Sequence, residues 1–203
     1  MRTSLLAKLL LVAALAAFPA AAQVPLRADR AKSDFRIELG RAGLLKGLGD
    51  DHVIRVNDYD CMVALEEAAA ARSTVQLKVR AASLEVLDPQ LSAEKRAEVQ
   101  KKMQGPEVLD VARYGEIRFV SRKVAPLGGD RFRLEGDLTL REATKPATFE
   151  VHLARESDAL VATGEARVRL TDFGIRPPGA GGGMVKVKDE MKIAFRLVLV
   201  PAH

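Results

Sequence analysis

The residues with the clearest chemical potential lie near position 50, where His52 directly follows Asp50 and Asp51. An imidazole and two carboxylates are groups that zinc accepts, but zinc normally takes three or four well-spaced ligands. The other histidines, His152 and His203, have no spacing that completes such a set. We therefore expect a hydrogen-bonded structural histidine with no metal or cofactor, and keep a metal-dependent or redox-related role for His52 as an alternative.

Other groupings of polar residues give little support for catalysis. Asp110 and Asp137 invite comparison with a hydrolytic carboxylate pair, yet Asp137 fits the outward face of an alternating strand and Asp110 fits a turn or helix cap. Ser121 lies in no nucleophile elbow. The glycine-rich run at 177–185 lacks the strand-to-helix setting and Gly-Lys-Ser/Thr ending of a phosphate loop. We expect a hairpin loop there and no enzymatic activity.

The chain begins like an exported protein. Arg2 and Lys8 precede an apolar run, 9–18, and small residues precede Gln23. This is typical of a signal peptide, residues 1–22, cleaved after Ala22. The run is too short to cross roughly 30 Å of hydrocarbon, and no later segment has ~20 consecutive apolar residues. We expect a periplasmic protein with no stable membrane anchor.

Residues 23–203 are expected to form a single domain. The formal net charge of +5 falls to +3 without Arg2 and Lys8, and acidic and basic residues are mixed along the chain. Such a surface lacks a basic stripe with interleaved aromatic residues, so we expect no nucleic-acid partner. Cys61 is the only cysteine. Because it has no partner for a disulfide, a buried thiol in a strand is expected.

Apolar and polar residues alternate through many segments after about residue 34, which is the pattern of half-buried strands. Gly136 falls in the apolar row of Leu134 and Leu138, where a glycine implies a bend or a close approach. The segments expected to form strands are 35–39, 53–57, 60–66, 74–81, 116–124, 131–140, 145–154, 160–170 and 192–200.

One segment, Ser92 to Gln104, has the composition of an exposed helix. Ser92 is expected to cap its N-terminus, Lys101 and Lys102 lie near its C-terminus, and Gly105 follows. Its apolar positions are sparse, which predicts a lid or connector lying against the sheet. Eight or more strands with one helix favour a mainly all-β, antiparallel fold, closed as a barrel or folded as a sandwich. An eight-stranded barrel is filled by side chains or holds one slender ligand.

The sequence resembles the YceI-like family of exported polyisoprenoid-binding proteins, most closely at residues 105–175. The shared motifs are a Leu-Asp-Val and Tyr segment, a Phe-x-Ser strand end, a Gly-Asp-Leu-Thr-Leu strand, a Thr-Lys-Pro turn and an Asp-Phe-Gly. In this chain they are Leu109, Asp110, Val111, Tyr114, Phe119, Ser121, Gly136, Asp137, Leu138, Thr139, Leu140, Thr144, Lys145, Pro146, Asp172, Phe173 and Gly174.

The resemblance implies an extended, lipocalin-like antiparallel β-barrel of about eight strands around an isoprenoid lipid of the quinone or polyprenyl phosphate class. Two departures stand out. Many relatives have Gly-Arg where this chain has Glu142 and Ala143, and either residue would be strained at positive φ. A subset of relatives has Gly-His-x-His where this chain keeps only His52.

The apolar rows and the resemblance together predict the ligand-binding residues. The interior set is Phe119, Phe132, Leu134, Leu138, Leu140, Phe149, Val151, Val168, Phe173, Ile193, Phe195 and Leu197. A polar head would need donors at the barrel mouth. Arg41, Lys46 and His52 are expected to supply them because residues 41–52 read as a loop.

Three functions remain open at this point. The first is a non-catalytic periplasmic carrier of an isoprenoid lipid, with a homodimer left open. The second is a metal-dependent or redox-related enzyme, or a redox partner, that uses His52 and its acidic neighbours. In the third, the barrel is filled by its own side chains and is a stress-related interaction module, with the helix at 92–104 as contact surface.

Overall fold

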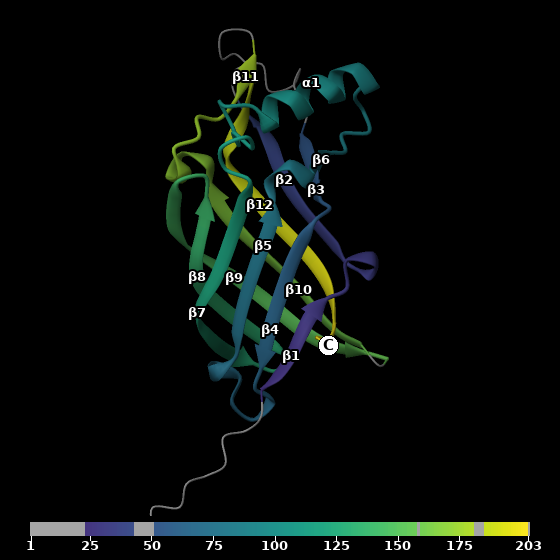
Figure 1. Cartoon of the computed structure of the whole chain (residues 1–203), viewed down its shortest axis with the longest axis vertical. Helices are drawn as coiled ribbons and strands as arrows, with labels where there is room; N and C mark the ends of the chain where they lie inside the picture. The colour runs from purple at the N-terminus through teal and green to yellow at the C-terminus, as the bar shows by residue number, and fades with distance from the viewer. Residues whose placement is uncertain (1–22, 43–50, 158, 181–184, 203) are drawn as a thin grey trace, which may run out of the picture.

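The computed structural model describes residues 23–42, 51–157, 159–180 and 185–202, and its strands form one antiparallel sheet (Figure 1). The strands are β1 Val24–Ala28, β2 Asp34–Ala42, β3 His52–Val56, β4 Tyr59–Leu65, β5 Thr74–Arg80, β6 Leu84–Val86, β7 Glu116–Gly128, β8 Arg131–Leu140, β9 Ala143–Glu156, β10 Ala159–Arg169, β11 Gly179–Ala180 and β12 Val185–Pro201. The helical segments are α1 Ala93–Gln104 and the 3-10 turns η1 Arg30–Lys32, η3 Glu67–Arg72, η4 Ala81–Ser83 and η5 Leu170–Phe173.

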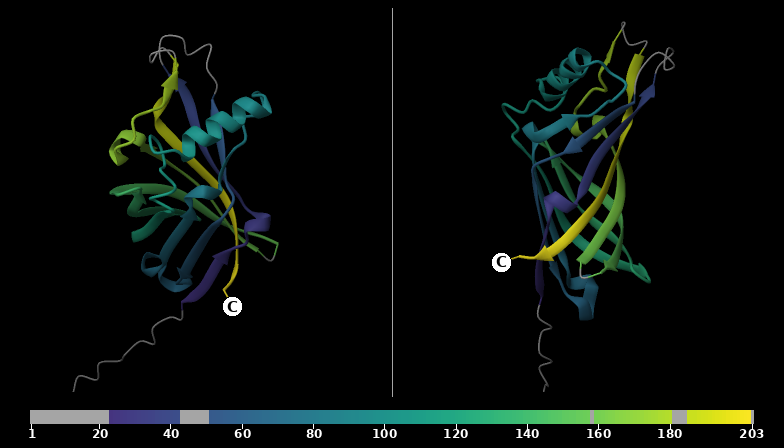
Figure 2. Two further views of the ribbon diagram at one scale, coloured as in Figure 1. Left: turned by 45° about the horizontal axis from the view of Figure 1, so that its top comes forward. Right: turned by 90° about the vertical axis from the view of Figure 1, so that its right-hand side faces the viewer.

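Eight of these strands close into a barrel, which settles the choice between barrel and sandwich. Their order is β1-β4-β5-β7-β8-β9-β10-β12, and β12 returns to β1 through the pairs Leu26↔Pro201 and Ala28↔Leu199. The earlier part of β12 pairs instead with β2, from which β3 and β6 continue the sheet. The length of β12 therefore lets it belong both to the closed barrel and to an extension at one end (Figure 2).

The alternation read from the sequence matches the two faces of the strands. In β8, Gly136, Leu138 and Leu140 are buried while the residues between them are more exposed. The close approach expected at Gly136 is made by Phe119 of β7, since a Cβ on Gly136 would lie 2.6 Å from the Cζ atom of that ring. The glycine thus provides room for an aromatic ring inside the barrel.

The turn expected at Thr-Lys-Pro lies elsewhere. Thr144, Lys145 and Pro146 belong to β9, and the chain reverses at Arg141 and Glu142. The positive φ falls on Arg141, at 56°, and not on Glu142 or Ala143. The Arg141 guanidinium lies 5.4 Å from the centre of the Tyr114 ring. Stacking of a cation on an aromatic face offsets part of the backbone strain.

The predicted helix is confirmed in its position and its caps. The Ser92 hydroxyl accepts from the Lys95 amide at 3.3 Å, and the helix ends before Gly105. α1 lies across the end of the barrel where β2, β3 and β6 extend the sheet (Figure 2). Its Gln100 side chain accepts from the Val86 amide at 2.8 Å and donates to the Leu84 carbonyl at 2.7 Å. One glutamine therefore provides the hydrogen bonds that a neighbouring strand would give to β6.

Candidate ligand-binding cavity

A cavity of about 570 Å³ lies inside the barrel beneath α1, and we call it the upper cavity. Its size falls within the range of pockets that hold small molecules. The wall is mostly aliphatic and aromatic, with polar side chains confined to a few positions of β3 and α1. The lining residues from the strands include Phe35, Ile37, Leu39, His52, Ile54, Val56, Leu77, Val79, Leu84, Val86, Ile117, Leu138, Leu140, Phe149, Val187, Met191 and Ile193.

A second space of about 100 Å³, the lower cavity, continues along the barrel toward η3. Ala70 of η3 and Ser73 line it, together with Cys61 of β4. Ala70 and Ser73 belong to the connection between β4 and β5, which lies at the end of the barrel opposite α1 (Figure 1). A space this small is below the ~150 Å³ of an apolar protein cavity that binds benzene. By itself the lower cavity accommodates only the tip of an apolar chain.

Three side chains line both cavities and therefore form the partition between them. They are Phe35 of β2, Leu77 of β5 and Phe149 of β9. Phe149 lies 4.9 Å from Phe119 and 6.1 Å from Phe195, measured between ring centres. Phe35 lies 6.1 Å from Phe195. We call this group of four phenylalanines and Leu77 the waist of the barrel.

His52 lines the upper cavity and is held by a residue that its sequence neighbours do not suggest. Its Nδ1 atom lies 2.6 Å from Oδ2 of Asp88, whose side chain is 0% exposed. The other carboxylate oxygen of Asp88 accepts from the Val53 amide at 2.8 Å. Because a carboxylate only accepts, this geometry places the proton on Nδ1 and leaves Nε2 for a ligand.

The remaining polar side chains of the upper cavity come from α1. Lys95, Glu98 and Lys102 follow one another at helical spacing on the same face. The Lys102 ammonium donates to the Gly179 carbonyl at 3.0 Å, which ties α1 to β11. Both lysine side chains lie at the edge of an otherwise apolar space. They supply positive charge where a polar headgroup would meet solvent.

The predicted interior residues divide among the two cavities and the surrounding core. Those that line the upper cavity are Leu138, Leu140 and Ile193, and those that line the lower cavity are Phe119, Phe132, Leu134, Val151, Phe195 and Leu197. Phe149 lines both. Val168 and Phe173 are buried in the hydrophobic core but line neither cavity. Both are packed within the core, and alternation alone does not distinguish such a position from one that borders a cavity.

The three predicted donors at the mouth also separate. His52 lines the upper cavity, whereas Arg41 lies within β2 and not in a loop, and it lines neither cavity. Arg41 donates from its backbone amide and side chain to Asp51, at 2.9 and 3.2 Å. Lys46 and Asp50 lie outside the described residues. Asp51 therefore pairs with Arg41 and not with His52. Within the described ranges, no group of three or more His, Cys, Asp or Glu side chains is arranged to hold a metal ion.

Three important residues were missing from the sequence prediction. Asp88 is 36 residues away from His52 and follows β6, so no local pattern joins the two. Its position in Leu-Asp-Pro, just before a helix cap, suggests only a turn residue. Phe35 and Leu77 lie in segments expected to form strands, 35–39 and 74–81, but their place in the waist depends on the barrel closing.

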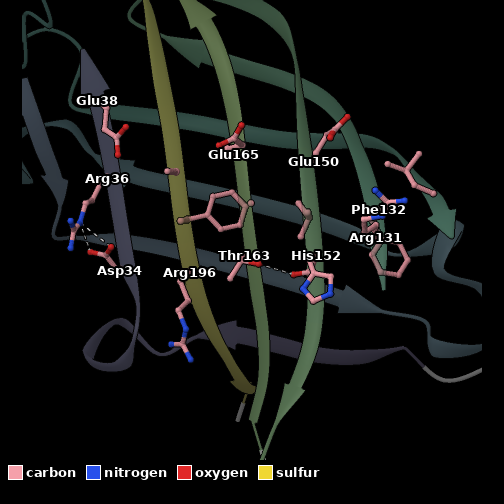
Figure 3. A pocket seen from close by; sticks show the side chains of 15 residues that line it. Asp34, Arg36, Glu38, Arg131, Phe132, Glu150, His152, Thr163, Glu165 and Arg196 are labelled. Atoms are coloured by element: carbon pink, nitrogen blue, oxygen red, sulfur yellow. Dashed lines mark hydrogen bonds and ion pairs between the residues drawn. The ribbon is translucent and has the colours of Figure 1, made fainter. Parts of the chain in front are cut away.

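The outer face of the barrel has a depression of about 480 Å³ across β2, β12, β10, β9 and β8. Figure 3 shows Glu150 and Glu165 on one side of it and His152, Thr163 and Arg196 on the other. Several charges here are balanced by their neighbours. The ion pairs are Arg36 with Asp34 at 2.9 Å, Arg133 with Glu150 at 3.5 Å and Lys192 with Glu165 at 3.2 Å. We interpret this depression as a solvated strand face with mixed charges.

The fold and the cavity together define a class of protein: a lipocalin-like β-barrel with an apolar interior of ligand size. The sequence matches the YceI-like domain over residues 27–199, and the chain belongs to that family. A UPF0312 protein of Pseudomonas putida (strain W619) is 30% identical over 129 residues, which are 61% of this chain and 63% of that protein. A UPF0312 protein of Pseudomonas fluorescens (strain SBW25) is 30% identical over 128 residues, 60% of this chain and 62% of the relative. This chain therefore spans less than two thirds of these relatives' length.

Solved structures show the same fold. BcnA of Burkholderia cenocepacia has a TM-score of 0.67 and 23% identity, with 84% of this chain and 98% of BcnA covered. The YceI protein of Campylobacter jejuni has a TM-score of 0.56 and 13% identity, with 74% and 84% covered. The expected lipocalin-like barrel and the resemblance to the YceI-like family are both confirmed.

Proposed function

We propose that this chain is a periplasmic carrier that holds an isoprenoid lipid, of the quinone or polyprenyl phosphate class, and does not catalyse a reaction. The observation that carries the proposal is the upper cavity, which is apolar along its wall and polar only on β3 and α1. That distribution fits a long apolar tail with a single polar head. Membership of the YceI-like family supports the choice of an isoprenoid as the ligand in this proposal.

Burial of the tail would supply most of the binding free energy. Apolar surface removed from water contributes roughly 25 cal/mol per Å², and a preformed cavity needs little reorganisation to receive a chain. Two aliphatic side chains from α1, Val99 and Met103, close the cavity on the side facing the helix. Movement of α1 would give a lipid its way in.

The polar head would lie near His52, Lys95 and Lys102. The Nε2 atom of His52 accepts a hydrogen bond when the ring is neutral and donates one when it is protonated. Two ammonium groups favour an anionic head such as a phosphate, while Glu98 between them moderates the charge. The hydrogen bond to Asp88 fixes the orientation of the His52 ring toward the cavity. We propose that His52 binds the polar head and does not act as a catalytic acid or base.

Periplasmic location is part of the proposal and rests on the sequence of residues 1–22, which lie outside the described residues. Within the part of the chain that the structure describes, no helix has the length and apolar character needed to cross a membrane. We propose a hydrophobic lipid as the partner, with no stable membrane anchor and no nucleic acid. A measurement of the mass in solution would distinguish a monomer from a homodimer.

The first test is native mass spectrometry of protein that has been exported to the periplasm and purified without detergent. Organic extraction then identifies any bound molecule. A stoichiometric isoprenoid adduct is the expected result. An apo mass, together with no uptake of added quinones or polyprenyl phosphates, would contradict the proposal and favour a barrel filled by its own side chains.

A matched pair of variants tests the location. Leu138→Glu places a charge in the upper cavity and should abolish lipid retention, since a buried unpaired charge excludes an apolar chain. Val120→Glu places the same charge on the neighbouring strand, at an exposed position on the outer face, and should retain lipid. Ile193→Trp narrows the upper cavity without adding charge and should also lower occupancy. Equal retention by all three folded variants would place the lipid elsewhere.

A further inference from the structure

The cavity inside the barrel is divided by the waist, and the division bears on ligand length. Phe35, Leu77 and Phe149 line both the upper and the lower cavity, so no other part of the wall is common to the two spaces. The polar side chains Lys95 and Lys102 lie in the upper cavity alone. A lipid whose head is near these lysines would therefore point its tail toward the waist.

Two of the waist rings are fixed by the backbone of neighbouring strands. Phe119 occupies the space left by Gly136, and Phe195 occupies the space left by Gly164. A Cβ at either glycine would lie 2.6 Å from the Cζ atom of the adjacent ring. The two rings therefore occupy the space that a side chain on either glycine would need. They pack edge to face against Phe35 and Phe149, the two rings of the partition.

The partition itself consists of side chains and not of backbone. Phe149 contacts Phe119 and Phe195, while Phe35 contacts Phe195 and Tyr59. Rotation of Phe149 would join the lower cavity to the upper one, but it would break its contacts with two rings. The closed partition is therefore the state favoured by packing.

We infer that Phe149, with Phe35 and Leu77, sets the maximum length of the apolar chain that the barrel holds. This inference rests on the proposed function, because it specifies the ligand of the same cavity. Tails that end at the waist are fully buried, whereas longer tails must displace the rings or leave carbon atoms in water. The lower cavity is the space that a longer tail gains when Phe149 is made smaller.

The experiment measures affinity along a series of polyprenyl phosphates: geranyl, farnesyl, geranylgeranyl and solanesyl. Each methylene that is buried adds about fourfold in affinity, from ~0.8 kcal/mol per group. In the wild-type protein, affinity should rise with chain length and stop rising before solanesyl. Phe149→Ala and Leu77→Ala should move that limit by at least one isoprene unit toward longer chains.

Phe173→Ala is the matched control, because Phe173 is a buried phenylalanine that lines neither cavity. It should leave the length limit unchanged even though it lowers stability. Phe149→Leu gives a smaller shift in the same direction and remains informative if Phe149→Ala does not fold.

The outcomes separate the two proposals. Two results would overturn the role of the waist while leaving lipid binding intact. One is wild-type affinity that rises without a limit through solanesyl, and the other is a length limit in Phe149→Leu and Leu77→Ala that is unchanged from the wild-type protein. Absence of binding for every probe in the wild-type protein would overturn both the proposed function and this inference.

Discussion

Gly164 of β10 lies directly across the strand ladder from Phe195 of β12, and its missing side chain is the space that the phenyl ring occupies. A Cβ built at Gly164 would lie 2.6 Å from the ring and 2.7 Å from the Glu150 carbonyl oxygen. A glycine within a strand lowers β-propensity. Here it leaves room for the ring of Phe195, which is part of the waist.

Substitution of Gly164 by alanine should therefore destabilise the barrel. The Glu150 carbonyl belongs to the adjacent strand and cannot rotate away, so the added methyl group forces a shift of the backbone or of Phe195. We expect a loss of about 1–3 kcal/mol in the free energy of unfolding, as for other overpacked positions. Urea unfolding measures it. Gly115→Ala is the control, since a Cβ there meets nothing within 4 Å, and an equal loss at both sites would contradict this explanation.

Asp88 should be far more important for stability than the carboxylate next to His52 in sequence. Asp88→Ala leaves the His52 ring and the Val53 amide without their partner in a buried setting, which costs about 1–3 kcal/mol. Asp51→Ala removes an exposed ion pair with Arg41, for which ~0–1 kcal/mol is expected. The free energies of unfolding of the two variants should differ accordingly. A larger loss of stability in Asp51→Ala than in Asp88→Ala would contradict the role given to Asp88.

Gln100 should control the exposure of the β6 edge. In Gln100→Ala the Val86 amide loses its acceptor and the Leu84 carbonyl loses its donor. Hydrogen exchange at Val86 should accelerate, and lipid should enter and leave faster because α1 is held less firmly. Lys101→Ala alters an exposed position of the same helix and is the control. Exchange at Val86 that is equally slow in both variants would show that other contacts hold α1.

Cys61 gives a prediction about pH. Burial raises the pKa of its thiol to about 12 from an ordinary value of 9.0. The folded state thus binds the proton more tightly than the unfolded state, and the contribution to stability is complete below pH 9.0. As the pH rises from there toward the folded pKa, the free energy of unfolding should fall by up to about 1.4 kcal/mol per pH unit.

The measurement for Cys61 is urea unfolding at several pH values, in the wild-type protein and in Cys61→Ala. The variant has a small cavity and a lower stability at neutral pH, so the useful quantity is the slope of stability against pH. The wild-type slope should be steeper above pH 9.0, the ordinary pKa of the thiol. Parallel slopes for the two proteins would mean that the thiol does not titrate with unfolding.

Several elements were predictable because their signals are local. Alternation with a period of two identifies β8 and the other long strands, since successive side chains of a strand face opposite sides. Ser92 and Gly105 mark the ends of α1 through hydrogen bonds that involve only nearby residues. The Thr-Lys-Pro motif was described as a turn, yet Pro146 lies in β9, within the strand expected at 145–154.

The amino-acid sequence was enough to predict the helix and the long alternating strands with their two faces, but not the short strands β1, β6 and β11. Two relationships appear only in the folded chain: Asp88 holds His52, and Phe35, Leu77 and Phe149 divide the cavity. These residues lie on elements distant in sequence, and only closure of the barrel through β12 and β1 sets their positions. Whether an inward residue fills the core or borders a cavity depends on the volumes of all its neighbours together, because packing is a property of the whole barrel and not of one strand.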